Sequence, residues 1–306
     1  MSAPFVHLSV HSEYSLADSV VRIRGLVSAA AERNMPAVAL TDHANMMGSF
    51  HFVREVGAHN RRISELPESE RPHELKPILG CEFFVCEDRH NKSVKDYGYQ
   101  IVMLAKNKNG YHNLAKMSSI AYTEGFYYVP RIDREVVARY KEDIIVLTGN
   151  LYGEVPSKIL NQGEKEAEEA LLWWKEHFGD DLYVELMRHG QEDEDRANQS
   201  LVALAKKHEV SLVATNNTYY CDKEDAEAHD IAHETHGAKI AIVPNPAPEL
   251  STPDDEPRGP VVLYLGRIHE KKNLSALIAA WIAARPDLPE GATLTVAGWG
   301  DDAGID

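Results

Sequence analysis

Short apolar runs alternate with helical patterns along roughly the first 220 residues, and this alternation limits the fold more than any other feature of the sequence. Apolar residues recur at helical spacing between the first two runs, with Asp18 or Ser19 as a candidate N-cap. The seven strand candidates are Phe5–Val10, Ala37–Thr41, Pro77–Val85, Tyr99–Ala105, Ile144–Thr148, Leu182–Met187 and Ser211–Thr215. Further helices are predicted at Gly110–Tyr122, Gly163–Phe178 and Asp193–His208.

This order of elements predicts an α/β fold. Strands that alternate with helices pair in parallel through right-handed crossovers. Seven such units in one stretch favour a closed or nearly closed (βα) barrel over an open sheet.

The charge balance limits the partners of this chain. It has 32 Lys and Arg against 48 Asp and Glu in 306 residues, a net charge of -16. A phosphate backbone is bound by clustered basic residues, so we expect no autonomous nucleic-acid binding. The longest apolar run, Ala276 to Ala284, is too short for a membrane span, and no secretion signal is evident. Three cysteines without CxxC spacing fit a reducing cytoplasm.

The character of the chain changes near residue 232. Eight of the 15 prolines lie beyond that point, and six of them lie between Pro244 and Pro260. We therefore predict a barrel domain over 1–231, a junction and proline-rich linker over 232–260, and a separate segment over 261–306. That last segment shows two strand patterns and one strong helix, Leu274 to Ala284.

Chemistry in a (βα) barrel lies at the carboxyl ends of the strands. His11 and Asp18 follow the first run, His43 follows the second beside Asp42, and Glu82 lies in the third. We expect Asp42 to orient the second nitrogen of His43. Imidazole and carboxylate groups at one rim suit a divalent-metal hydrolase site with zinc, manganese or iron. Rim residues that only hydrogen-bond to one another fit the same pattern, since no HExxH cluster is present.

Seven ordered blocks of sequence carry a resemblance to a known family. They read FVHLSVHSEYSLADS, VALTDHANMMGSFHF, KPILGCEFFV, IVMLAKNKNGYHNLAKMSS, GFYYVPRID, IIVLTGN and LVATNNTYY. Together they resemble the N-terminal polymerase-and-histidinol-phosphatase (PHP) domain of the alpha subunit of bacterial DNA polymerase III, over about residues 4 to 231. The resemblance implies a distorted (βα)7 barrel with metal ligands on its rim.

Four ligand positions of that family keep a ligand here. His11 matches the second His of the HxH motif, Asp18 the acidic ligand after it, His43 the His of the second motif and Glu82 the Glu of the third strand. Five positions carry other residues. Ser9 replaces the first His, Gln100 the His of the fourth strand, Asn150 a Cys or His, and Asn217 and Tyr219 the closing Asp-x-His.

The substitutions bear on activity. Neutral Ser, Asn, Gln and Tyr side chains bind divalent ions weakly, so we expect no metal or one weakly bound zinc, manganese or magnesium ion, and we assign no catalytic residue. The resemblance then implies a silent domain that stabilises the polymerase core and contacts the proofreading exonuclease subunit. The alternative is a metal-dependent phosphoesterase or 3′–5′ exonuclease that uses the four remaining ligands. The polymerase module of the family is not in this sequence.

The tail resembles a second family. AKIAIVPNPAPE, VVLYLGRIHEKKNLSALIAAWIAA and ATLTVAGWGDD look like the start of the Rossmann-like C-terminal half of a GT-B glycosyltransferase. In that family an Arg and a Lys approach the donor diphosphate, and Arg267 and Lys272 hold those positions. A solvated basic turn is the simpler interpretation of the pair. The chain is thus predicted to join a PHP barrel to a partial Rossmann-like segment as a fusion or chimera, with nucleotide-sugar transfer as a third functional hypothesis.

Overall fold

The computed structural model describes residues 5–16, 18–234, 261–267 and 293–299. It divides into two units, Met1–Ile240 and Ala241–Asp306, and each is treated by itself. No helix in the described part of the chain is long and apolar enough to cross a membrane.

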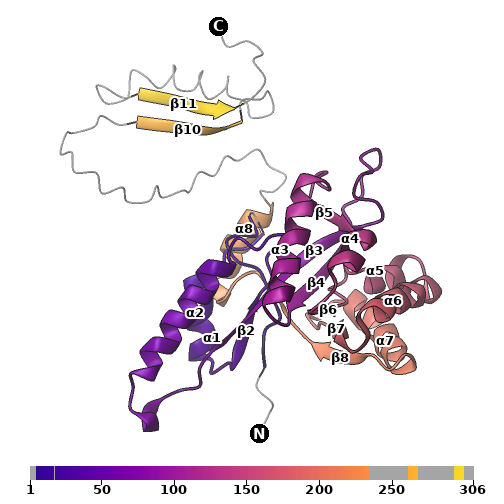
Figure 1. Ribbon diagram of the computed structural model, residues 1–306, viewed down its shortest axis with the longest axis horizontal. Helices are drawn as coiled ribbons and strands as arrows, with labels where there is room; N and C mark the ends of the chain where they lie inside the picture. The colour runs from indigo at the N-terminus through magenta and orange to yellow at the C-terminus, as the bar shows by residue number, and fades with distance from the viewer. Residues whose placement is uncertain (1–4, 17, 235–260, 268–292, 300–306) are drawn as a thin grey trace, which may run out of the picture. The chain divides into compact units, whose positions relative to one another are not determined.

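A curled seven-stranded sheet forms the centre of the first unit, with six strands in the order β2-β3-β4-β6-β7-β8 and β5 beside β3 (Figure 1). Strands occur at all seven predicted places, and β5 and β9 were not predicted. The strands are β1 (Ser9–Val10), β2 (Ala37–Leu40), β3 (Lys76–Cys86), β4 (Tyr99–Ala105), β5 (Arg131–Asp133), β6 (Ile144–Leu147), β7 (Leu182–Leu186), β8 (Ser211–Ala214) and β9 (Asn217–Thr218).

A short strand pair links the two edges of this sheet. Strand β1 pairs in parallel with β9, and the backbone N–H groups of Ala39 and Thr41 in and after β2 donate to the carbonyls of His7 and Val10. The predicted strand over Phe5–Val10 was wrong in length, because only Ser9 and Val10 pair with β9. The ring of strands is therefore complete at the carboxyl end of β1 and weakly joined below it.

One strand runs against the predicted direction. Strand β4 is antiparallel to both β3 and β6, while β2, β3, β6, β7 and β8 pair with their other neighbours in parallel. No helix lies between β3 and β4, and a connection without a crossover returns the chain antiparallel. Gly98 closes this return at φ 73°, where an added Cβ would lie 2.9 Å from the backbone of Phe84 and Val85.

Helices cover the outer face of the sheet. They are α1 (Ile23–Glu32), α2 (Ser49–Ser64), α3 (Lys108–Thr123), α4 (Arg134–Tyr140), α5 (Glu154–Asn161), α6 (Glu164–Phe178), α7 (Glu192–Lys207) and α8 (Ala226–Glu234), and three short 3-10 turns span Glu68–Glu70, Gly179–Asp181 and Lys223–Asp225. The predicted cap of α1 was wrong, since the helix follows Arg22. The Ser19 hydroxyl donates instead to the His11 and Tyr219 carbonyls, and Asp18 contacts His43.

Two apolar clusters hold these helices. The larger one packs α3 to α7 against outward side chains such as Phe83, Met103 and Val184, with Trp174 completely buried. The smaller one packs α1 and α2 against β2. Inward side chains of the same strands are thereby left to fill the barrel and to build its two ends.

In the second unit, β10 (Val261–Arg267) pairs in parallel with β11 (Thr293–Trp299). These strands match the two strand patterns of the sequence. The linker from Pro244 to Pro260, the helix from Leu274 to Ala284 and Lys272 lie outside the described residues, so the Rossmann-like assignment stays a prediction.

Candidate metal centre at the carboxyl end of the barrel

Three side chains meet at the upper end of the barrel. His11, His43 and Glu82 each offer a ligand atom, and these atoms all lie within 4.8 Å of one another. The His43 Nε2 is 3.1 Å from Glu82 Oε1, and the His11 Nε2 is 3.5 Å from Glu82 Oε2. His11 and Glu82 are at most 1% exposed, so the cluster is closed to bulk water on two of its three sides.

Strand register brings these residues together. His43 and Glu82 form a parallel bridge, in which the Ala44 N–H donates to the Glu82 carbonyl and the Glu82 N–H donates to Asp42. His11 follows β1, which is fixed beside β2 by the bond from the Thr41 N–H to Val10. Three neighbouring chain segments thus deliver one ligand atom each.

The charges of the cluster partly offset one another, because one imidazolium lies between two carboxylates. Burial alone would lower the pKa of His43, but the Asp18 and Glu82 carboxylates raise it to about 10. Burial opposes ionisation of Glu82, yet the nearby His11 and His43 hold its pKa below the usual range. Burial, and then repulsion by His43, lowers the pKa of His11. The site therefore holds a protonated His43 between two carboxylates beside a neutral His11.

The fourth retained residue, Asp18, acts on His43. Its Oδ2 lies 3.0 Å from His43 Nδ1, which leaves Nε2 facing Glu82. The expectation that Asp42 would orient His43 was wrong. Asp42 accepts instead from the Ser12 backbone N–H and from the Ser12 and Ser15 hydroxyls, because it is buried beneath the loop after β1.

The atoms present fit one divalent ion. The His11 Nδ1 is buried without a hydrogen bond, and the printed contacts of His11 Nε2 and Glu82 Oε1 are to other members of the triad. Two imidazole nitrogens and one carboxylate oxygen are a donor set for zinc or manganese. Such an ion would be held by His11, His43 and Glu82, and Asp18 would orient His43 from behind.

The five substituted positions line the same end of the barrel, where they bond to one another. The Ser9 hydroxyl donates to Asn217 Oδ1 at 3.2 Å, and the Asn217 amide donates to the Tyr219 hydroxyl at 3.2 Å. On the other side, the Asn150 amide donates to Gln100 Oε1 at 2.9 Å. These neutral groups satisfy each other and add no charge to the site.

Tyr219 also occupies space beside the cluster. Its ring stacks on His11 with 4.5 Å between centroids and 9° between planes, and its hydroxyl lies 3.4 Å from His43 Nε2. Stacking of this kind follows from the fold and has no signal in the sequence.

Glu185 is a buried acid that the sequence analysis missed. It points inward from β7, since its neighbour Val184 packs in the outer core. Its Oε1 accepts from the Thr215 hydroxyl, while its Oε2 has no hydrogen bond. Burial, assisted by the negative charge of Glu82, raises the pKa of Glu185 to about 7. Strand alternation around Val184 is the one sequence signal that could have found it.

The anion-binding pair predicted in the tail remains a prediction. Arg267 ends β10, but its side chain is outside the described part, as is all of Lys272.

Comparisons with known proteins agree with this architecture. The PHP domain family matches residues 7–189. The chain is 39% identical over 231 residues to the DNA polymerase III subunit alpha of Borreliella burgdorferi and 38% identical over 241 residues to that of Aquifex aeolicus. These alignments cover 74% and 76% of the chain but 19% and 20% of the relatives, so the chain spans about a fifth of their length.

A distant likeness exists among solved structures. A Bifidobacterium adolescentis protein, provisionally described as a metal-dependent phosphoesterase, matches at 12% identity and a TM-score of 0.44 over 75% of this chain and 96% of its own. Such a score supports no argument about function.

Proposed function

Because this chain belongs to the PHP domain family, we propose that its barrel is a metal-poor member that serves a structural and partner-binding role in a bacterial replicative DNA polymerase. Its homology to the N-terminal region of the alpha subunit supports this parentage. The proposal places the activity of the whole polymerase elsewhere, since the chain covers about a fifth of those relatives. A cytoplasmic location would follow from that role.

The neutral network around the triad is the observation that supports the proposal most. Hydrolysis of phosphate esters by metal ions uses charge to stabilise the developing oxyanion and to lower the pKa of water. Here Ser9, Asn217 and Tyr219 bond to one another on one side, and Gln100 bonds to Asn150 on the other. None of these groups contributes a negative charge or an imidazole to a second ion.

A single ion would also meet competition. At His43 it has to displace the proton that Asp18 and Glu82 hold there. An ion bound by His11, His43 and Glu82 would supply a positive charge for Lewis-acid chemistry. The role of the chain's own side chains would be to hold this ion, and Tyr219, which stacks on His11, narrows the space beside it.

The proposed partners are the polymerase core and the proofreading exonuclease subunit. This part of the proposal rests on the family resemblance of residues 4 to 231 and on the relatives that match there. A role of this kind needs a correctly folded surface and does not require catalytic residues on the rim of the barrel.

The second candidate is a metal-dependent phosphoesterase or 3′–5′ exonuclease. The buried His11 Nδ1, which has no hydrogen bond, favours it, because buried polar atoms without a partner are costly and are often explained by a ligand. The two candidates differ in how many ions the purified chain retains and in whether it turns over substrate.

Metal analysis and hydrolysis assays together decide between them. We expect the purified chain to retain well under one tightly bound transition metal and to leave aryl phosphates and DNA 3′ ends intact with added manganese or zinc. The triple variant Ser9→His, Asn217→Asp and Tyr219→His returns three ligands and should raise metal content. Two or three ions per chain, or manganese-dependent hydrolysis that His43→Gln abolishes, would establish the enzymatic candidate instead.

Complex formation tests the partner role separately. The purified exonuclease subunit should co-elute with the chain, and His43→Gln should leave co-elution unchanged because the proposed surface does not need the metal centre. Failure of the wild-type chain to co-elute would remove this part of the proposal.

A further inference from the structure

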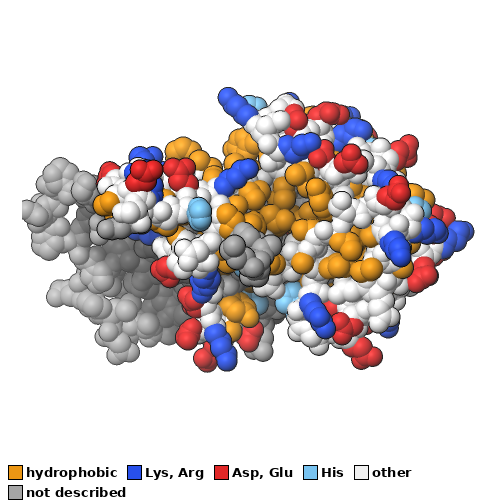
Figure 2. All heavy atoms as spheres, turned by 90° about the horizontal axis from the view of Figure 1, so that it is seen from below, with side chains coloured by type: hydrophobic (Ala, Val, Ile, Leu, Met, Phe, Trp, Pro, Cys, Tyr) orange, Lys and Arg blue, Asp and Glu red, His pale blue; other side chains and the backbone are white. Residues whose placement is uncertain are grey.

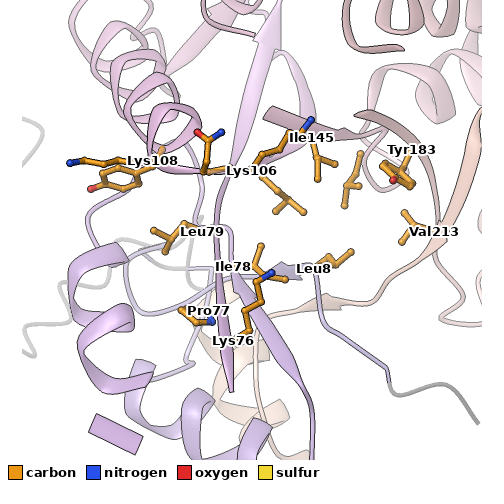
Figure 3. A pocket seen from close by; sticks show the side chains of 15 residues that line it. Leu8, Lys76, Pro77, Ile78, Leu79, Lys106, Lys108, Ile145, Tyr183 and Val213 are labelled. Carbon is orange, nitrogen blue, oxygen red and sulfur yellow. The ribbon is translucent and has the colours of Figure 1, made fainter. Parts of the chain in front are cut away.

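A large apolar hollow lies at the end of the barrel opposite the metal centre. Its volume is about 800 Å³, within the range of roughly 300 to 1,000 Å³ found for ligand pockets. Its walls come from the amino ends of β3 and β7, the carboxyl end of the antiparallel β4, and strands β6 and β8 (Figure 3). The lining residues are Leu8, Lys76, Pro77, Ile78, Leu79, Leu104, Ala105, Lys106, Asn107, Lys108, Tyr111, Ile145, Leu147, Tyr183 and Val213.

The hollow exists because the strand ring is incomplete at this end. A packed (βα) barrel fills its interior with layers of side chains from neighbouring strands. Here Val102, Leu104 and Leu147 belong to a buried cluster, whereas Leu8 and Val213, which pack against it, are only partly buried. The two-residue β1 leaves Leu8 in an irregular segment, so no strand among the described residues closes the gap between β2 and β8 at this end.

Its apolar walls are accessible to solvent. Figure 2 shows a broad hydrophobic area on one face of the molecule, surrounded by both basic and acidic side chains. Large exposed apolar areas of this kind mark interaction sites or ligand-binding grooves. The concave shape favours a ligand that enters the barrel over one that lies flat upon it.

The charged side chains that line the hollow are all basic, and the Asp181 carboxylate lies beside one of them. All three charged lining residues are lysines, Lys76, Lys106 and Lys108, although the whole chain carries a net charge of -16. Lys106 already pairs with Asp181 at 2.7 Å. Lys76 and Lys108 are exposed and form no ion pair within the described part of the chain. Lys76 reaches along the hollow toward Ile78 and Leu8, whereas Lys108 points away from it (Figure 3).

We infer that this hollow binds an unbranched alkyl carboxylate, with the alkyl chain inside the barrel and the carboxylate at Lys76. An apolar chain gains free energy from burial against these walls, and a carboxylate is stabilised by the ammonium group that faces the hollow. If each non-hydrogen atom takes about the 30 Å³ that a water molecule occupies in the liquid, chains of 12 to 18 carbons occupy roughly 400 to 600 Å³, which is less than the volume of the hollow. This inference is independent of the role proposed for the metal centre.

Titration of the full chain with dodecanoate, followed by calorimetry, tests the inference. We expect one saturable site per chain with a dissociation constant of about 1 to 50 μM. Lys76→Glu reverses the charge of an exposed side chain and should weaken binding at least tenfold. Val213→Trp fills the hollow from β8 and should abolish binding, and the exposed Lys165→Glu on α6 is the matched control that should bind as the wild type does.

Two further measurements keep the result unambiguous. Unfolding temperatures of the variants show whether each is folded, and dodecanol replaces dodecanoate to test the role of the charge. No saturable binding below 1 mM, or dodecanol bound as tightly as dodecanoate, would overturn the inference. So would a dimer by light scattering that Val213→Trp dissociates, since a second copy would then occupy the hollow.

Discussion

Replacement of Glu185 by Gln should make the protein more stable, and increasingly so as pH rises. The carboxyl group is 1% exposed, its Oε2 has no hydrogen bond, and burial raises its pKa from an ordinary 4.5 to about 7. Gln keeps the shape and the acceptor for the Thr215 hydroxyl, but it cannot ionise. The substitution therefore removes the cost of a buried negative charge.

The sign follows from the two pKa values. Below pH 4.5 both the folded and the unfolded chain keep the Glu185 proton, so the acid has no pH-dependent cost. Between pH 4.5 and about 7 only the unfolded chain loses it, and the free energy of unfolding falls as pH rises. Above about pH 7 both states are ionised and the loss is complete. At about 1.4 kcal/mol per pH unit, the full loss is about 3 kcal/mol.

Urea unfolding at pH 6.2 and pH 8.5 measures this effect on both sides of the transition and avoids the isoelectric point near 5.4. By linkage, about 2 kcal/mol of the loss has accumulated at the lower pH, so the advantage of Glu185→Gln over wild type should grow by about 1 kcal/mol between the two. The exposed Glu142→Gln is the matched control, with parallel wild-type and variant profiles expected. A constant difference for Glu185→Gln would show that the native carboxyl is already ionised at pH 6.2, and would refute the argument.

Three further outcomes are expected. Arg131→Met should destabilise the fold by about 3 kcal/mol or more in urea unfolding, because the completely buried guanidinium donates to four backbone carbonyls and each lost bond costs about 1 kcal/mol. The exposed Arg139→Met should cost under about 1 kcal/mol, and equal losses for the two variants would contradict the role assigned to Arg131. Gly110→Ala should lower the unfolding temperature, because its Cβ would lie 2.1 Å from the Asp143 carbonyl oxygen. Gly57→Ala in α2 should raise the unfolding temperature through helix propensity, and a higher unfolding temperature for both variants would show that α3 can shift freely. Calorimetry at low salt should detect no saturable binding of single-stranded DNA or of a uridine or guanosine diphosphate sugar below ~1 mM, and a micromolar isotherm would revive a nucleic-acid or nucleotide-sugar role.

The local pattern of the sequence predicted where strands lie but not how they are directed. Apolar runs such as those around Ala37 and Leu182 are bounded by helical patterns, which fixes their position along the chain. The direction of β4 depends on whether a helix precedes it. The loop between β3 and β4 forms turns instead, in which Asp88, Asn91 and Asp96 side chains accept from backbone N–H groups two residues on. The length of β1 likewise depends on partners far away, namely Asn217 and Thr218.

The site shows the same division. His11, His43 and Glu82 were proposed from their places after or within strands, and the structure puts their ligand atoms within 4.8 Å. Proximity in sequence did not predict which carboxylate contacts His43. Asp18 is 25 positions away, whereas Asp42 is the neighbour in sequence. The contacts that decide the chemistry are long-range, and the sequence gives the residue types without their pairing.

The neutral network around the triad and the positive charge of His43 depend on one another. A rim crowded with carboxylates would repel itself without ions, and buried charges without partners are costly. With Ser9, Asn217 and Gln100 in place of ligands, Glu82 and Asp18 are the acids in contact with His43, and one proton on His43 offsets part of their charge. The barrel can therefore fold with this end closed by hydrogen bonds and a single ion pair. Selection for a stable surface would preserve such an end, because each neutral residue there already has its partner in the folded chain.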